Sequence, residues 1–169
     1  MGWTPQPPRW IDPPWRPLLG HSLERAEECV AGFYAIRPRE WTTRFRYDIA
    51  SCHDHPELPF TCTSLAQIVR LDAPPPRPGR YRIVLRDPQL FSLADEYDPV
   101  AVLTVTLAHE MVHLVRFGQG LAHFELPERL RQAEERRVRR IAEDAVLKAV
   151  EPSERRRFAE LIGEASPPR

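Results

Sequence analysis

Hydrophobic and polar positions recur with two different periods along this chain, and the period changes from one segment to the next. Over residues 22–36 the apolar positions recur at spacings of three and four, which is typical of an amphipathic helix that Ser22 would cap. Over residues 43–50 apolar and polar residues alternate singly, which indicates a half-buried strand. The early part of the chain is therefore predicted to be a helix followed by a strand.

Two further strands and three helices are predicted downstream. A run rich in β-branched residues over 63–71 and an alternating segment over 80–86 would complete a small three-stranded sheet. Helical patterns then cover residues 99–117, 128–150 and 153–162. This order of helix, strands and helices predicts an α+β fold.

Both ends of the chain are predicted to lie outside the folded domain. Residues 1–17 are dense in proline and tryptophan, and the fixed φ of proline disfavours both a helix and an inner strand there. The expected organisation is a Pro/Trp-rich tail over residues 1–20, one domain over 21–163 and a short tail over 164–169.

Composition and charge narrow the possible functions. The chain has 169 residues, of which 42% are hydrophobic, so it has material for a core. Its 24 basic and 24 acidic residues cancel, which leaves no excess positive field for a nucleic acid. No apolar run is judged long enough for a membrane span, no secretory signal is recognised, and three cysteines argue against a disulfide framework. We expect a cytoplasmic protein that binds neither nucleic acid nor membrane, and the sequence does not indicate its oligomeric state.

The helix predicted over residues 99–117 contains the motif His109-Glu110-Met111-Val112-His113. Four residues advance a helix by about one turn, so the two imidazoles project from one face and can bind one metal ion together. Glu110 lies about 100° further round the helix, where it can contact a water on the metal rather than join the ligands. Only about 0.02 matches to this motif are expected by chance for this composition, so the motif predicts a metal site.

A catalytic zinc ion usually has three protein ligands and one open position, so a third ligand must come from elsewhere in the chain. A metzincin would have a glycine and a third histidine where this chain has Arg116 and Gln119, which excludes that branch. The candidates for the third ligand are His123, Glu125, Glu134, Glu135 and Asp144.

These residues resemble the zincin metallopeptidases, specifically the gluzincin branch in a minimal single-domain form. In gluzincins a later helix supplies a glutamate ligand, followed by apolar or small residues at plus three, six and seven. Glu135 matches this pattern with Val138, Ile141 and Ala142. The resemblance covers residues 98–150. It implies a zincin-like fold, in which an N-terminal helix and a small sheet pack on a buried active-site helix and a glutamate-bearing helix.

The resemblance further implies that His109, His113 and Glu135 bind Zn²⁺, and that Glu110 is the general base for the zinc-bound water. The substrate would be a peptide or protein. In zincins the strand before the active-site helix pairs with an extended peptide, and residues 80–86 hold that position in this chain. Arg139 departs from the family pattern, because many gluzincins have an acid or amide there that holds a histidine.

A helical wheel of residues 128–150 favours the neighbouring glutamate instead. Glu134 falls inside the apolar arc of that helix, whereas Glu135 lies about 60° beyond it. We predict Glu135 as the ligand, because a ligand should lie where the apolar face meets the open cleft. Glu134 is then expected to be a rim carboxylate paired with Arg131 or Arg137, and His123 and Glu125 stay as alternative ligands.

Two other functions fit the sequence. One is a zinc-binding regulatory or interaction module that keeps the fold but does not hydrolyse peptides, and the other is a metal-free helical protein. Tyr97 is a candidate donor to the transition state, and Arg116 is a candidate for holding either the ligand glutamate or a substrate carboxylate. A separate group has donor types suited to a second zinc, although its spacing matches no common motif: Cys52, His53, Asp54, His55 and Cys62.

Overall fold

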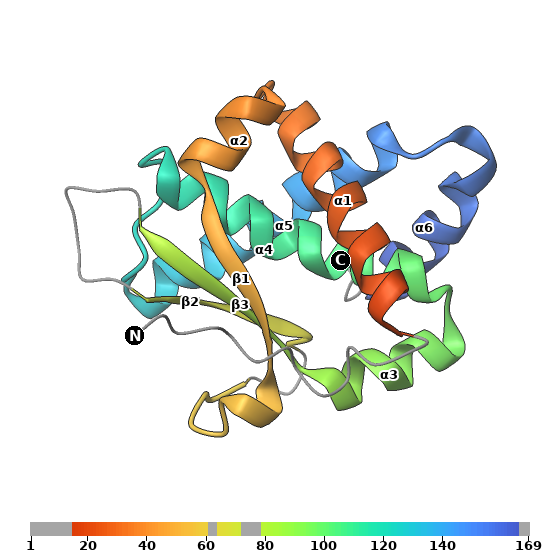
Figure 1. Ribbon diagram of the computed structural model, residues 1–169, viewed down its shortest axis with the longest axis horizontal. Helices are drawn as coiled ribbons and strands as arrows, with labels where there is room; N and C mark the ends of the chain where they lie inside the picture. The colour runs from red at the N-terminus through yellow and green to blue at the C-terminus, as the bar shows by residue number, and fades with distance from the viewer. Residues whose placement is uncertain (1–14, 61–63, 72–78, 166–169) are drawn as a thin grey trace.

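A computed structural model describes residues 15–60, 64–71 and 79–165, and this part of the chain has an α+β fold (Figure 1). The elements are, in chain order, α1 (Trp15–Phe33), α2 (Pro38–Arg44), β1 (Arg46–Ser51), the 3-10 turn η2 (Cys52–Asp54), β2 (Ala66–Arg70), β3 (Arg80–Leu85), α3 (Asp87–Glu96), α4 (Pro99–Gly118), α5 (Glu128–Ala149) and α6 (Pro152–Ala165). Helix α4 packs against a small sheet, and the other long helices pack around α4.

The three described strands form a mixed sheet in the order β1-β3-β2. β1 runs parallel to β3, with Arg46 opposite Arg80, while β2 runs antiparallel to β3, with Ile68 opposite Ile83. β3 is the central strand, and all of its residues after Arg80 are buried. Both hydrogen-bonding edges of β3 are therefore used, and β1 and β2 are the edge strands.

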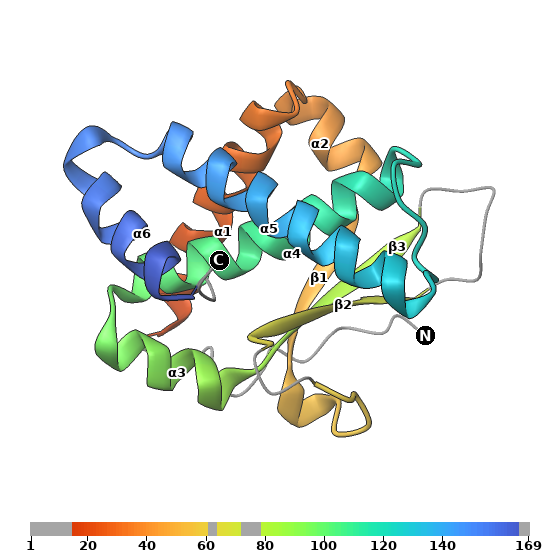
Figure 2. The ribbon, with the colours of Figure 1, turned by 180° about the vertical axis from the view of Figure 1, so that it is seen from behind.

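Helix α4 is the core of the molecule. It packs against α1, α5, α3 and the sheet, and α5 lies across it in the view from behind (Figure 2). Its start is defined by the Asp98 side chain, which accepts a hydrogen bond of 2.9 Å from the Ala101 backbone N–H, and by Pro99 in the first turn. Because its residues are apolar almost all round, α4 is buried on nearly every side.

By length and composition alone α4 could cross a membrane, contrary to the expectation from sequence. Its most apolar window has a mean hydropathy of 1.4, and 78% of that window is buried inside the protein. A core helix passes the same test, and the burial of α4 among the other elements accounts for its apolar character.

The first helix begins earlier than predicted. α1 starts at Trp15, so residues 15–20, expected to be part of the tail, are helical. Pro17 is tolerated because it lies in the first turn, where backbone N–H groups have no helical partner. Ser22 does not cap the helix but is buried inside it, with its hydroxyl 3.5 Å from the carbonyl oxygen of Val100. Residues 1–14 of the predicted tail lie outside the described residues.

Two short helices were not predicted. α2 occupies residues 38–44, so the strand expected from Thr43 begins only at Arg46. α3 follows β3 directly. Both helices have proline in their first turn, where it favours helix initiation rather than breaking a helix. The other predicted strands and helices are confirmed as β2, β3, α4, α5 and α6, with α6 extending to Ala165 and residues 166–169 lying outside the description.

Candidate metal centre

The structure brings together the three predicted ligand residues from α4 and α5. The Nε2 atom of His109 lies 3.2 Å from Oε2 of Glu135, and Nε2 of His113 lies 3.1 Å from Oε1 of Glu135. One potential ligand atom from each residue lies within 4.8 Å of the others. Within the described part of the chain, this is the one group of three or more His, Cys, Asp or Glu side chains so arranged.

The donor set of this cluster fits a zinc ion. Two imidazole nitrogens and one carboxylate oxygen are the donors of a typical catalytic zinc site with one open position. The His113 side chain is 7% exposed, that of His109 24% and that of Glu135 51%, so the cluster has a buried side and an open side. Burial opposes ionisation of Glu135, but hydrogen bonds with both histidines outweigh it and hold the pKa of Glu135 below its usual range.

His113 is held on one side by Glu135, through its Nε2 atom, and on the other by ring packing. Its ring stacks on Phe117 with centroids 5.7 Å apart, while its buried Nδ1 atom has no hydrogen-bond partner. Histidines that bind zinc usually donate their second ring N–H to a carboxylate or carbonyl. No such partner of His113 lies among the described residues, and Arg139, which departs from the gluzincin pattern, is exposed.

Glu110 is buried beside the cluster, with 6% of its surface exposed. Burial in this apolar environment raises the pKa of Glu110 to about 7; the charge of Glu135 adds to this effect, and His109 and the backbone of Ile68 oppose it. Glu110 projects to a different side of α4 from the two histidines, toward β2. It is therefore a carboxyl group close to the cluster but outside the group of three donors.

The hydrogen bonds of the sheet show which edge faces Glu110. The Leu71 N–H donates to Arg80, and the Arg86 N–H donates to the Leu65 carbonyl. Because bonded and non-bonded pairs alternate along an antiparallel ladder, the backbone groups of residues 66, 68 and 70 point away from β3. The Ile68 N–H that reaches Glu110 belongs to this outer set. The open edge of β2 therefore faces Glu110, the residue next to His109 in the chain.

Glu134 pairs with Arg137, as predicted, but its closer partner is Arg116, which was not predicted. It is 8% exposed and forms a two-point ion pair with Arg116, in which Nη2 of Arg116 lies 3.1 Å from Oε2 and Nε binds Oε1. Arg137 is a more distant neighbour at 3.7 Å, and Arg131 pairs with Glu128 instead. Glu134 is thus a buried residue rather than a rim carboxylate, because α5 turns it toward α4.

The other candidate residues lie apart from the cluster. His123 and Glu125 are exposed in the loop after α4, and Asp144 is exposed two turns beyond Glu135. Tyr97 ends α3, before α4 begins, so ten residues of helix, about 15 Å, separate the start of α4 from His109.

The residues considered for a second zinc, for which no site was predicted, form no group of three donors in the described part of the chain. Cys52 is a free thiol, and His55 contacts Glu57 at 3.2 Å and Arg82 at 3.3 Å. Cys62 lies outside the described residues.

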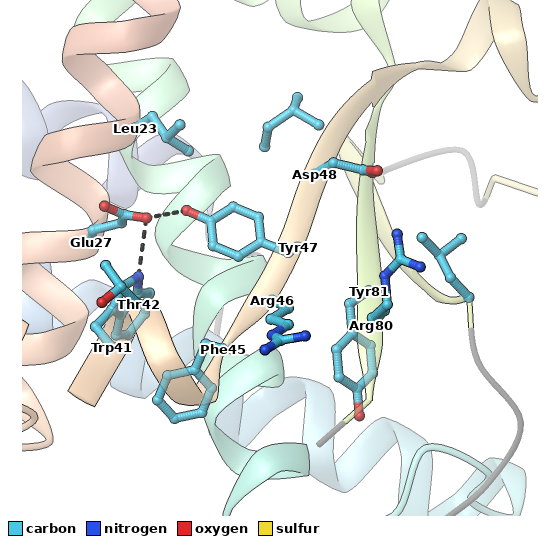
Figure 3. Close-up of a pocket in the computed structure, with 12 residues that line it drawn as sticks. Leu23, Glu27, Trp41, Thr42, Phe45, Arg46, Tyr47, Asp48, Arg80 and Tyr81 are labelled. Atoms are coloured by element: carbon cyan, nitrogen blue, oxygen red, sulfur yellow. Dashed lines mark hydrogen bonds between the residues drawn. The ribbon is translucent and has the colours of Figure 1, made fainter. Parts of the chain in front are cut away.

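A separate hollow lies away from the cluster. It has a volume of about 640 Å³ and is lined by residues of α1, α2, β1 and the ends of β2 and β3 (Figure 3). Inside it Glu27 accepts hydrogen bonds from the Tyr47 hydroxyl and from the Trp41 indole N–H. None of the cluster residues lines this hollow, so it is separate from the candidate metal centre.

Comparison of the chain with models of protein families, with curated proteins and with solved structures gives no match. The interpretation of the centre therefore depends on its residues and their geometry.

Proposed function

We propose that this protein is a zinc-dependent metallopeptidase. The observation that carries the proposal is the convergence of His109, His113 and Glu135, with Glu110 buried beside them. A zinc ion held by this set would polarise a peptide carbonyl and lower the pKa of a water molecule. The donors are nitrogen and oxygen atoms in a number and a mixture that suit zinc better than calcium or magnesium.

Glu110 is the proposed general base. A base must lie close to the water it deprotonates without occupying the metal, and Glu110 is next to His109 in sequence but on another side of α4. Its surroundings are apolar, and the Ile68 N–H binds its carboxylate, which limits how the side chain can turn. Glu110 would accept the proton of water and return it to the leaving amine.

The substrate is proposed to bind along β2 rather than along residues 80–86. β3 is paired on both sides and cannot accept another strand. β2 has its outer edge toward Glu110, and no described strand pairs with that edge. An extended peptide added there would place its backbone beside the cluster, and main-chain hydrogen bonds would supply affinity with little sequence selectivity.

One observation favours the alternative of a zinc-binding module without turnover. The buried Nδ1 atom of His113 has no partner, so this histidine lacks the hydrogen bond that usually tunes a zinc ligand. Such a module would bind zinc and a peptide but would not hydrolyse it.

Exchange of Glu110 for glutamine tests the proposal. Glu110→Gln should bind zinc as the wild type does, because Glu110 is not among the three donors. It should lose hydrolysis of an unstructured protein such as casein by at least about a hundredfold, because an amide cannot accept the proton. Zinc content and cleavage are measured on the same preparations, with and without a chelator. Zinc-loaded wild type that cleaves nothing supports the alternative module, and loss of zinc in Glu110→Gln would make Glu110 a ligand or a structural residue.

A further inference from the structure

Arg70 lies at the end of β2 on the face that covers α4. Side chains alternate between the two faces of a strand, so Arg70 shares a face with Ala66 and Ile68, both of which are buried. The residue opposite Arg70 in the sheet is Tyr81, whose side chain belongs to the core. Arg70 is therefore an arginine placed at the border of the core, on the edge strand that faces Glu110.

One nitrogen of the Arg70 guanidinium has no partner among the described residues. This nitrogen, Nε, is buried without a hydrogen-bond partner, and no other arginine nitrogen in the described residues is buried in this state. By contrast, the guanidinium groups of Arg82 and Arg116 bind Asp48 and Glu134 through two nitrogens each. A buried N–H without an acceptor destabilises the protein, and the Arg70 side chain as a whole is only half-buried, so a carboxylate that reached its guanidinium would bring a counter-charge and acceptors to it.

A wall of aromatic rings connects Arg70 to the cluster. The His113 ring stacks on Phe117, which in turn lies 6.1 Å from the Tyr81 ring and 5.3 Å from the Phe124 ring, measured between centroids. Tyr81 is close enough to Arg70 for the charge of the arginine to act on the phenol. The wall thus leads from a predicted ligand to the guanidinium, with Phe124 partly exposed at its rim.

The spacing suits an extended peptide. Glu110 binds the Ile68 N–H, and Arg70 lies two residues further along β2, about 7 Å away. The same distance separates alternate side chains of a peptide paired with that edge. One peptide residue would lie beside Ile68. The side chain two positions further along the peptide would then lie next to Arg70.

We propose that Arg70 binds a carboxylate of the substrate, on the side of the cluster where α4 ends, and so selects acidic peptides. This inference rests on the proposed function, because it needs a peptide bound along β2. A carboxylate can accept two parallel N–H bonds from a guanidinium. This paired arrangement is stronger than a single neutral hydrogen bond. The carboxylate is either an Asp or Glu side chain or the end of the peptide chain.

Peptide binding to the zinc-loaded Glu110→Gln protein tests the inference, because this variant should leave the peptide intact. Labelled short peptides carry either one glutamate or one glutamine at the same position, each with a free or an amidated carboxyl end, and fluorescence anisotropy measures Kd. We expect one carboxylate to improve Kd by about tenfold. The pair of peptides that shows the gain identifies which carboxylate is bound.

Second substitutions in the same background assign the effect to Arg70. Arg70→Ala and the better-packed Arg70→Gln should both abolish the gain. Arg155→Ala, which removes the same charge from an exposed position on α6, should keep it. Equal Kd values for all peptides, no measurable binding of any peptide, or a gain that survives both Arg70 substitutions would overturn the inference.

Failure of the inference can be separated from failure of the proposed function. Hydrolysis is measured separately with Glu110 intact. Cleavage without any preference for a carboxylate in binding overturns the role of Arg70 alone, whereas a preference in binding without cleavage overturns the peptidase and leaves Arg70 as a binding residue.

Discussion

At the scale of single residues, two adjacent glutamates have separate roles. A helix rotates about 100° per residue, so Glu134 and Glu135 of α5 cannot face the same partner. Glu134 is buried against Arg116, with side-chain exposures of 9% and 7%, whereas Glu135 is half exposed and lies between the two histidines. We infer that the first joins α5 to α4 and that the second belongs to the metal centre.

Alanine substitutions of these glutamates should separate stability from zinc binding. Glu135→Ala removes one of three donors, so zinc affinity should fall by at least about a hundredfold while the fold persists. Glu134→Ala leaves the buried charge of Arg116 unpaired, so the free energy of unfolding should fall by about 3 kcal/mol while the folded protein still binds zinc. Zinc titration and urea unfolding of each variant measure the two effects.

Glu134→Gln is the matched control, because an amide can still accept a hydrogen bond from Arg116 and should cost less stability than alanine. If Glu134→Ala loses zinc while Glu135→Ala keeps it, the assignment of the third ligand is wrong.

The sequence predicted which site residues lie together only where they are neighbours on one helix. The spacing of His109 and His113 follows from one helical turn, and their proximity needed no knowledge of the rest of the chain. The helical wheel identified burial correctly, since Glu134 is indeed a buried residue of α5. It did not indicate that Glu135 lies beside the two histidines, because the burial of Glu134 is explained by Arg116, and that partner comes from another helix.

At the scale of elements, the end of α4 lies in close contact with Phe45, the residue before β1. Gly118 is the last residue of the helix, and a Cβ atom there would lie 2.8 Å from Cε1 of Phe45. The Phe45 ring is buried and lies 5.1 Å from Trp41, centroid to centroid, so it has little room to move. The absence of a side chain at position 118 allows the end of α4 to approach Phe45, which lies between α2 and β1.

Two glycine-to-alanine substitutions should have opposite effects. Gly118→Ala forces Phe45 to move and should lower the free energy of unfolding by about 1–3 kcal/mol. Gly20→Ala lies in the exposed part of α1 with nothing within 4 Å of the new Cβ, and should raise it by about 0.5–1 kcal/mol through helix propensity. Denaturant unfolding measures both. Equal effects of the two substitutions would show that Phe45 yields without cost.

Elements with a long periodic pattern were predictable, whereas short ones and strand order were not. α4 and α5 show their period over many residues, and both were predicted. α2 spans only seven residues, which is too few for a helical period to show, and proline ends a helix as readily as it begins one. The place of β3 in the middle of the sheet depends on pairing with distant segments, so the sequence could not indicate that β2 borders Glu110.

At the scale of the whole molecule, α4 and α5 are joined at two neighbouring points. One is the ion pair of Arg116 and Glu134, and the other is the cluster of His109, His113 and Glu135. Two of the predicted zinc ligands come from α4 and one comes from α5. An ion bound to all three would tie the two helices together in the folded state, and the unfolded chain holds no such site.

Zinc should therefore stabilise the whole protein. One equivalent is expected to bind per chain, and free zinc at about a hundred times its Kd should add about 2.7 kcal/mol to the free energy of unfolding. For a chain of this length the corresponding rise in Tm is about 5–10 °C, measured by scanning calorimetry with and without a chelator. His109→Ala and His113→Ala should abolish the rise, and magnesium should not produce it, because magnesium prefers oxygen ligands in octahedral geometry. A Tm that zinc leaves unchanged in the wild type, or raises equally in the histidine variants, would show that the cluster does not bind the ion.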